Sequence, residues 1–127
     1  MRVLTLREPW ASLIGEKIKG IETRSWSTKY RGELFIHAGL TKVKKADADF
    51  VGMLNGNLHY GTIFCKCTLV DCIYIDKEFA EVVKKTNPAN YICGDYSEGR
   101  YAWVLEDIEP INPIPAKGHL SIWRYEE

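Results

Sequence analysis

Three charged side chains at the spacing Lys-x-x-Glu-x-Arg interrupt a stretch that is otherwise apolar. Lys19, Glu22 and Arg24 lie between an apolar helix pattern and an apolar strand pattern. If residues 20–25 are extended, Glu22 and Arg24 point to the same face, because side chains alternate along a strand. Charges in such a setting must pair with one another or face a cleft.

Two interpretations of these three residues remain open. In the first, Glu22 and Arg24 form a structural ion pair and Lys19 is solvated. In the second, they line a cleft for a nucleotide or nucleobase, in which Arg24 is a bidentate clamp for phosphate or base and Glu22 holds it in place. Lys19 would then contact phosphate or, if desolvated, act as a general base.

Length and composition predict one soluble domain over residues 1–127. Hydrophobic residues make up 46% and charged residues 27% of the chain, and no apolar run approaches the roughly 20 residues of a membrane span. The N-terminus is too short and too alternating for a signal peptide, so we expect a cytoplasmic protein with no membrane contact. Cys65 and Cys67 have no Cys or His partner at ligand spacing, so we expect no metal and no cofactor.

The neutral net charge hides an asymmetry along the chain. Residues 1–45 hold ten Lys and Arg against four acids, and the remaining residues hold seven against thirteen. A chain polarised in this way can present a basic face to phosphates while staying neutral overall.

The hydrophobic periodicity predicts six strands and about three short helices. The strands are expected over residues 2–6, 21–25, 33–38, 62–75, 99–105 and 119–125, and the helices over 9–18, 43–54 and 77–85. The apolar phase slips after Leu69, which indicates a bulge of the kind that small barrels use to curl. Residues 106–115 carry three prolines and can only be a sheet edge or a loop. The fold class is therefore α+β, a small barrel with flanking helices.

Several motifs together resemble the ASCH domain, a family of the PUA-like superfamily. They are Glu8-Pro9-Trp10-Ala11-Ser12-Leu13, Ile18-Lys19-x-x-Glu22-x-Arg24-Ser25-Trp26, Tyr30-Arg31-Gly32, Phe35-Ile36-His37-Ala38 and Gly99-x-Tyr101-Ala102-Trp103-Val104-Leu105-Glu106. The resemblance covers nearly the whole chain and implies a stand-alone, six-stranded PUA-like pseudo-β-barrel with a cleft beside the first helix.

The family motif Gly-x-Lys-x-x-Glu-x-Arg places its charged residues at Lys19, Glu22 and Arg24. Two positions depart from the family pattern. Glu8 stands where the family often has Gln, which adds a negative charge near the implied cleft. Lys17 stands where the family usually has Gly, which bears on how the first helix ends.

The resemblance implies a domain that binds RNA or a nucleotide-like small molecule in that cleft. Aromatic residues beside basic ones are candidates for stacking bases. Beside the motif triad, the expected ligand-binding residues are Glu8, Trp26, Lys29, Tyr30 and Arg31.

Other relatives imply alternatives in which the chain is an enzyme. One is an amidohydrolase acting on N4-acylated cytidine, in which a lysine, here Lys19, activates a threonine. The threonine position is Glu22 in this chain, and Thr23 would point to the opposite strand face. Glu98 is a candidate for the assisting carboxylate. A metal-independent ribonuclease that relies on Lys19 is a second alternative, and a protein-interaction adaptor is a third.

Overall fold

A computed structural model describes residues 1–126 of the chain. Its strands are β1 (Arg2–Leu6), β2 (Ile21–Arg24), β3 (Gly32–Ala38), β4 (Thr62–Tyr74), β5 (Tyr101–Pro115) and β6 (Ile122–Arg124). Its helices are α1 (Trp10–Gly15), the 3-10 turn η1 (Lys45–Asp47), α2 (Ala48–Val51), α3 (Lys77–Thr86) and α4 (Pro88–Ile92). None of the helices described for residues 1–126 has the length and apolar character that crossing a bilayer demands.

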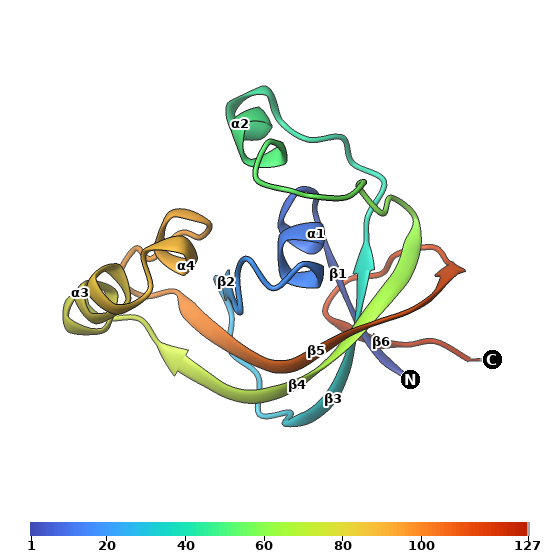
Figure 1. Ribbon diagram of the computed structural model, residues 1–127. Coiled ribbons are helices and arrows are strands. Elements are labelled where there is room, and N and C mark those ends of the chain that lie inside the picture. Colours follow the sequence, from blue (N-terminus) through green and yellow to red (C-terminus); the bar gives the residue numbers. More distant parts are fainter. Residues whose placement is uncertain (127) are drawn as a thin grey trace.

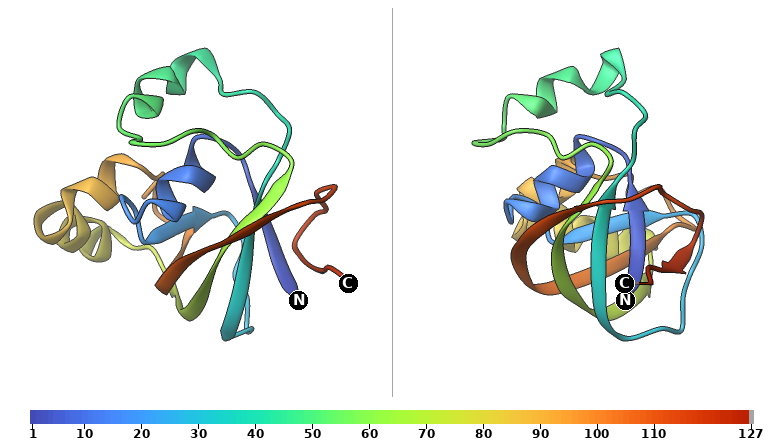
Figure 2. Two further views of the ribbon diagram at one scale, coloured as in Figure 1. Left: turned by 45° about the vertical axis from the view of Figure 1, so that its right-hand side comes forward. Right: turned by 90° about the vertical axis from the view of Figure 1, so that its right-hand side faces the viewer.

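The six strands form one curled sheet in the order β2-β5-β4-β3-β1-β6. Only β1 and β3 pair in parallel; the other neighbours are antiparallel. The sheet wraps into an open barrel, with α1 at its upper end and α3 and α4 to one side (Figures 1 and 2). The expected six-stranded PUA-like barrel is confirmed, and β2 and β6 are its two edges.

The curl of the sheet follows from the two long strands. The register between β4 and β5 shifts at three places, one of them between Leu69 and Asp71, where the sequence predicted a bulge. Each shift bends the strand and increases its twist, so β4 can follow the barrel wall. The inward side chains form a core around Leu4, Ile36 and Trp103, each of which is almost fully buried.

The proline-rich segment 106–115 is a sheet edge, which is one of the two alternatives, edge or loop, predicted from the sequence. β5 continues through Pro110 and Pro113 to Pro115, well beyond the predicted end at residue 105. From residue 106 onward it pairs with β4 on one side only, because β2 covers just its first residues. An edge strand can hold proline, since half of its backbone N–H groups need no ladder partner.

The end of α1 is set by a single residue in the left-handed region. Lys17 has φ +63°, its N–H donates to the Ile14 carbonyl, and the Ile18 N–H donates to the Leu13 carbonyl. These two bonds form a Schellman motif, whose left-handed position is usually glycine. Helix α1 is therefore shorter than the predicted helix over residues 9–18.

Residues 41–58 form an arm that stands away from the sheet above α1 (Figure 1). The predicted helix over 43–54 is reduced there to η1 and α2, and neither segment contains a buried residue. Phe50 packs on Trp10, with ring centroids 4.9 Å apart. The Glu16 carboxylate accepts hydrogen bonds from the backbone N–H groups of Asn55 and Gly56.

Helix α4 is not among the predicted helices, because an Asn-Pro pair usually ends a helix. Pro88 is instead the first residue of α4, where its missing N–H costs nothing, and the Asn87 side chain caps the helix by accepting from the Asn90 N–H.

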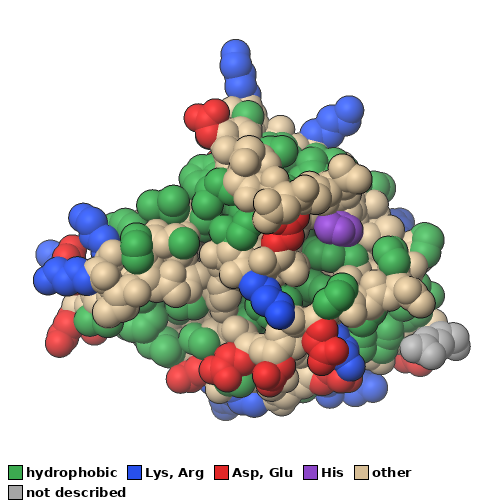
Figure 3. All heavy atoms as spheres, in the orientation of Figure 1, with side chains coloured by type: hydrophobic (Ala, Val, Ile, Leu, Met, Phe, Trp, Pro, Cys, Tyr) green, Lys and Arg blue, Asp and Glu red, His purple; other side chains and the backbone are tan. Residues whose placement is uncertain are grey.

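At the C-terminal end of the described residues, β6 is shorter than the strand predicted over 119–125. Figure 3 shows carboxylates gathered on the lower half of one face, over β4 and β5.

Candidate functional site

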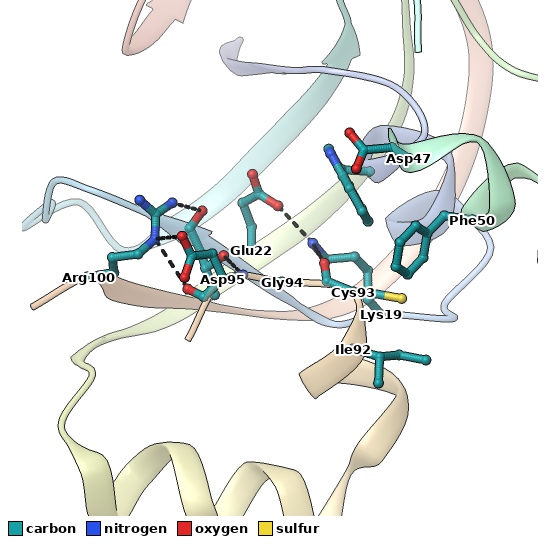
Figure 4. Close-up of a pocket in the computed structure, with 11 residues that line it drawn as sticks. Lys19, Glu22, Asp47, Phe50, Ile92, Cys93, Gly94, Asp95 and Arg100 are labelled. Carbon is teal, nitrogen blue, oxygen red and sulfur yellow. Dashed lines mark hydrogen bonds and ion pairs between the residues drawn. The ribbon is translucent and has the colours of Figure 1, made fainter. Parts of the chain in front are cut away.

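A pocket of about 410 Å³ opens between α1, β2, the arm and the loop that follows α4 (Figure 4). Its lining residues are Trp10, Lys19, Glu22, Thr23, Asp47, Phe50, Ile92, Cys93, Gly94, Asp95 and Arg100. The volume falls within the range of about 300–1,000 Å³ that is typical of small-ligand sites. Two of the three motif residues, Lys19 and Glu22, therefore lie in one concave site.

Lys19 is buried at the floor of this pocket, with 2% of its surface exposed. Its Nζ donates to Glu22 Oε1 at 3.0 Å and to the Cys93 carbonyl at 2.8 Å. It also lies 5.3 Å from the centroid of the Trp10 ring. Both hydrogen-bond partners are acceptors, so Nζ is the donor in each contact. The interpretation in which Lys19 is solvated is wrong.

Glu22 joins Lys19 to Arg24. Arg24 Nη1 donates to Glu22 Oε2 at 3.4 Å, as expected for residues on one strand face. The Arg24 guanidinium packs over Trp26, 5.4 Å from the ring centroid, and Arg24 does not line the pocket. Its Nε is one of two buried side-chain polar atoms without a hydrogen-bond partner among residues 1–126.

Thr23 also borders the pocket, although its side chain is on the strand face opposite Glu22. This happens because β2 is an edge strand and the pocket opens across its free edge. Thr23 Oγ1 accepts a hydrogen bond from the Asp95 N–H at 3.0 Å, and the Thr23 carbonyl accepts from Arg100 Nη2. The loop after α4 is thereby fastened to the strand.

Asp95 and Arg100 supply a second pair of opposite charges at the pocket. Arg100 Nε lies 3.6 Å from Asp95 Oδ2. Hydrogen bonds from the hydroxyl and backbone of Ser97 lower the pKa of Asp95, and Arg100 adds to that effect, so Asp95 is ionised at neutral pH.

One wall of the pocket is aromatic, and the rest of the lining combines charged side chains with Thr23 and the segment from Ile92 to Gly94. Trp10 and Phe50 form the aromatic wall, and Asp47 from the arm lies on the same side of the pocket as Phe50 (Figure 4). The lining carries three carboxylates and two cations, so it is not a basic site. Such a lining suits a flat, neutral, polar ring better than a free polyphosphate, whose negative charge the carboxylates would repel.

Four of the predicted ligand-binding residues lie elsewhere in the structure. Trp26 packs edge-on against Trp103, and Tyr30 donates its hydroxyl to the Glu33 carbonyl, both in the connection from β2 to β3. Lys29 and Arg31 are exposed in the same connection. None of the four lines the pocket.

The two remaining predicted residues, Glu8 and Glu98, are also outside the pocket lining. Glu98 is exposed in the loop before β5. Glu8 is buried, and it accepts hydrogen bonds from the backbone and hydroxyl of Ser12 and from the His59 N–H. Its carboxylate therefore ties the base of the arm to α1.

The cysteines provide no metal site. Cys65, Cys67 and Cys93 are buried free thiols, and burial raises the pKa of each, to about 12 for Cys67. Within residues 1–126, no group of three His, Cys, Asp or Glu side chains is placed to hold a metal ion.

Sequence reasoning missed Asp95, Arg100 and the Cys93 carbonyl as site components. All three lie in or next to an irregular loop that reaches the pocket only through tertiary contacts, so no local pattern marks them. Trp10 could have been found, because it sits at the start of the helix beside the implied cleft, but its apolar context favoured the core.

Comparison with known proteins identifies the family. The family model of the ASCH domain matches residues 4–115. Activating signal cointegrator 1 from Homo sapiens is 25% identical over 138 residues, which cover 97% of this chain and 22% of that protein. The protein of the same name from Mus musculus is 25% identical over 135 residues, with the same coverage. The chain thus spans about a fifth of the length of these relatives.

Solved structures show the same fold. The crystal structure of ASCH from Zymomonas mobilis has a TM-score of 0.58 and 17% identity, covering 90% of this chain and 72% of that one. A point variant of the Zymomonas mobilis protein has a TM-score of 0.56 and 18% identity, covering 90% and 74%. On the family match over most of its length, this chain belongs to the ASCH domain family.

Proposed function

We propose that this ASCH domain binds RNA or a nucleotide-like ligand by taking one unpaired base into the pocket. The observation that carries the proposal is the buried Lys19–Glu22 pair at the floor of a cavity with an aromatic wall. A base stacked on Trp10 would direct its polar edge toward Glu22, Asp47 and Lys19, which offer both acceptors and a donor.

Arg24 has a supporting role in this proposal. Its guanidinium is engaged by Glu22 and Trp26, so it orients the Glu22 carboxylate and does not itself clamp phosphate. The nearly balanced charge of the lining supports a base, recognised by shape and hydrogen bonds, as the group that enters.

Calorimetric titration with nucleosides and nucleoside monophosphates tests the proposal. We expect binding by the wild-type protein and a loss of at least tenfold in Asp47→Ala and in Trp10→Ala. Lys85→Ala, an exposed change on α3 far from the pocket, should bind as wild type does. If no nucleoside or nucleotide binds, or if the pocket variants bind normally, the proposal is wrong.

The amidohydrolase is the second candidate, and one observation favours it. The Thr23 hydroxyl borders the same pocket as Lys19, although it is not at the motif position of the nucleophile. Incubation with N4-acetylcytidine and with RNA, comparing wild type with Thr23→Val and Lys19→Ala, separates the functions. Turnover that both substitutions abolish would establish the hydrolase, while RNA cleavage that needs Lys19 alone would establish the ribonuclease. Binding without turnover leaves the proposed function in place.

A further inference from the structure

The lower end of the barrel, opposite α1, carries arginines that the pocket does not use. Both chain termini and the connection from β2 to β3 lie at this end (Figure 2, right). Trp26 and Tyr30 from that connection pack against the core there, and Arg24 and Arg2 lie over their rings.

Arg2 and Arg124 face each other directly across two strands. They are register partners in the antiparallel pair β1–β6, and both are exposed. Directly opposed residues have Cβ atoms about 5 Å apart, and like charges at that position destabilise a sheet. Within residues 1–126, neither guanidinium makes a hydrogen bond or an ion pair with another side chain, so the repulsion is not offset there.

The stacking of Arg2 leaves its hydrogen-bond donors available. Its guanidinium carbon is 4.8 Å from the centroid of the Tyr30 ring. Because a cation–π contact uses the flat face of the guanidinium, the N–H groups around its edge remain available for a phosphate. By contrast, Arg31 already donates to the carbonyls of Thr28 and Tyr30.

The surrounding charges leave this end positive. Lys29 is exposed beside Tyr30, and Arg31 faces Asp71 at 3.7 Å, so that pair is close to neutral. Other exposed carboxylates, such as Glu106 and Glu109, lie on β5. Two exposed acids lie near this surface along the chain: Glu33, which follows the connection, and Glu126, two residues after Arg124. They oppose the three cations Arg2, Lys29 and Arg124, so the balance of these exposed groups is positive.

We propose that Arg2, Lys29 and Arg124, together with Tyr30 under Arg2, form a surface that we call the arginine face, and that its three cations bind the phosphates of a single-stranded nucleic acid. A positively charged surface that follows the backbone is the electrostatic part of how proteins bind such strands. This surface is separate from the pocket, and its proposed ligand does not depend on which base, if any, the pocket accepts. The connection from β2 to β3 joins the two, since Arg24 contacts the pocket residue Glu22.

Binding of a labelled oligouridylate over a range of salt concentrations tests the inference. For single strands, log K falls with log salt by about 0.7 for each phosphate contact, so Arg2→Ala/Arg124→Ala should lower the slope by about 1.4. We also expect at least tenfold weaker binding at low salt. Lys77→Ala/Lys85→Ala removes the same charge from exposed positions on α3 and should change neither quantity by a comparable amount.

Three outcomes would overturn the inference: no binding by the wild type, equal losses in the two double variants, or stronger binding to phosphatidylserine vesicles than to the oligonucleotide. Oligodeoxyuridylate in a parallel arm distinguishes RNA from DNA. The melting temperature checks folding, and it should change little in Arg2→Ala/Arg124→Ala, because the substitution removes both the repulsion between the two arginines and the contact of Arg2 with Tyr30. Nucleoside binding in the pocket should persist in this variant, so failure of the pocket proposal and failure of this one are distinguishable.

Discussion

At the scale of single residues, the buried ammonium of Lys19 depends on its acceptors more than the half-exposed Arg24 does. Lys19 is held by a carboxylate and a carbonyl at the floor of the pocket, with 2% of its surface exposed, while the Arg24 side chain is 24% exposed. Glu22 therefore has one partner that it needs for burial and one that solvent can partly replace.

We predict that Lys19→Met lowers the free energy of unfolding by about 3 kcal/mol, because it leaves the buried Glu22 without its nearer counterion. Arg24→Ala should cost about 1 kcal/mol, since the Arg24 side chain is 24% exposed and solvent can replace part of its contact with Glu22. Urea denaturation of both variants measures the difference. Equal losses would mean that the two cations stabilise Glu22 to the same extent.

The four thiols differ in exposure, which predicts their reactivity. Cys72 is half-buried, whereas Cys65, Cys67 and Cys93 are buried with raised pKa values. Only thiolates react readily, so a disulfide reagent at neutral pH should label one thiol quickly and the rest upon unfolding. Cys72→Ser should abolish the fast phase. Fast labelling of a second thiol would contradict the burial of Cys65, Cys67 and Cys93.

At the scale of elements, the junction between α1 and β2 contains a strained backbone conformation at Lys17, which a substitution by glycine should relieve. Lys17 occupies a left-handed position that costs a residue with a Cβ roughly 1 kcal/mol relative to glycine. We expect Lys17→Gly to raise the free energy of unfolding by about that amount, measured by urea denaturation. Lys17→Ala keeps the Cβ and should give no such gain, and a gain of equal size in Lys17→Ala would assign the effect to the lost charge.

Glycine at position 15 shows the opposite requirement. A Cβ there would lie 2.6 Å from a ring carbon of Phe64, so α1 approaches the sheet closely at this point. This close approach, together with the tight ending at Lys17, directs the chain into β2 and places Lys19 beneath Trp10. The position of Lys19 in the site therefore depends on how α1 packs and where it ends.

The sequence predicted the elements best where hydrophobic periodicity is strong, as in β4. It failed where one residue type has two structural uses. Pro88 can end a helix or begin one, and the Asn87 cap decides for the second. Phe50 has the spacing of a core residue, yet it packs on Trp10 at the surface, because the arm has no sheet beneath it to cover.

At the scale of the whole molecule, His37 on β3 connects β1 and β6 with the segment that follows β5. Trp123 Nε1 donates to Thr5 Oγ1, Thr5 lies 3.1 Å from His37 Nδ1, and His37 Nε2 lies 2.7 Å from the Ala116 carbonyl. A neutral imidazole with its proton on Nε2 satisfies all of these contacts. Burial lowers the pKa of His37 from its ordinary value of 6.5, and nearby His119 lowers it further.

Because the pKa is lower in the folded state, the unfolded chain takes up this proton more readily. The free energy of unfolding should therefore be unaffected by His37 well above pH 6.5 and fall as pH drops below it. We expect His37→Gln to show a flatter decline between about pH 7.5 and about pH 5.5, measured by urea denaturation. The same decline in both proteins would assign the pH dependence to other groups.

The motif triad was predictable as a unit, but the complete site was not. Lys19, Glu22 and Arg24 are close in sequence, and strand alternation places Glu22 and Arg24 on one face of β2. Asp95 and Arg100 reach the pocket because the loop after α4 crosses the edge of β2, a contact between segments about 70 residues apart. Contacts between residues so distant in sequence cannot be predicted from the spacing of residues within a short segment.

The arm supplies Asp47 and Phe50 to the pocket, yet η1 and α2 bury none of their residues. Substitutions in this segment therefore escape the packing constraints that act on α1 and the sheet. During evolution, one wall of the pocket could change its ligand preference while the barrel stayed folded. In protein engineering, residues 45–51 are accordingly the natural segment to randomise when new binding specificities are sought.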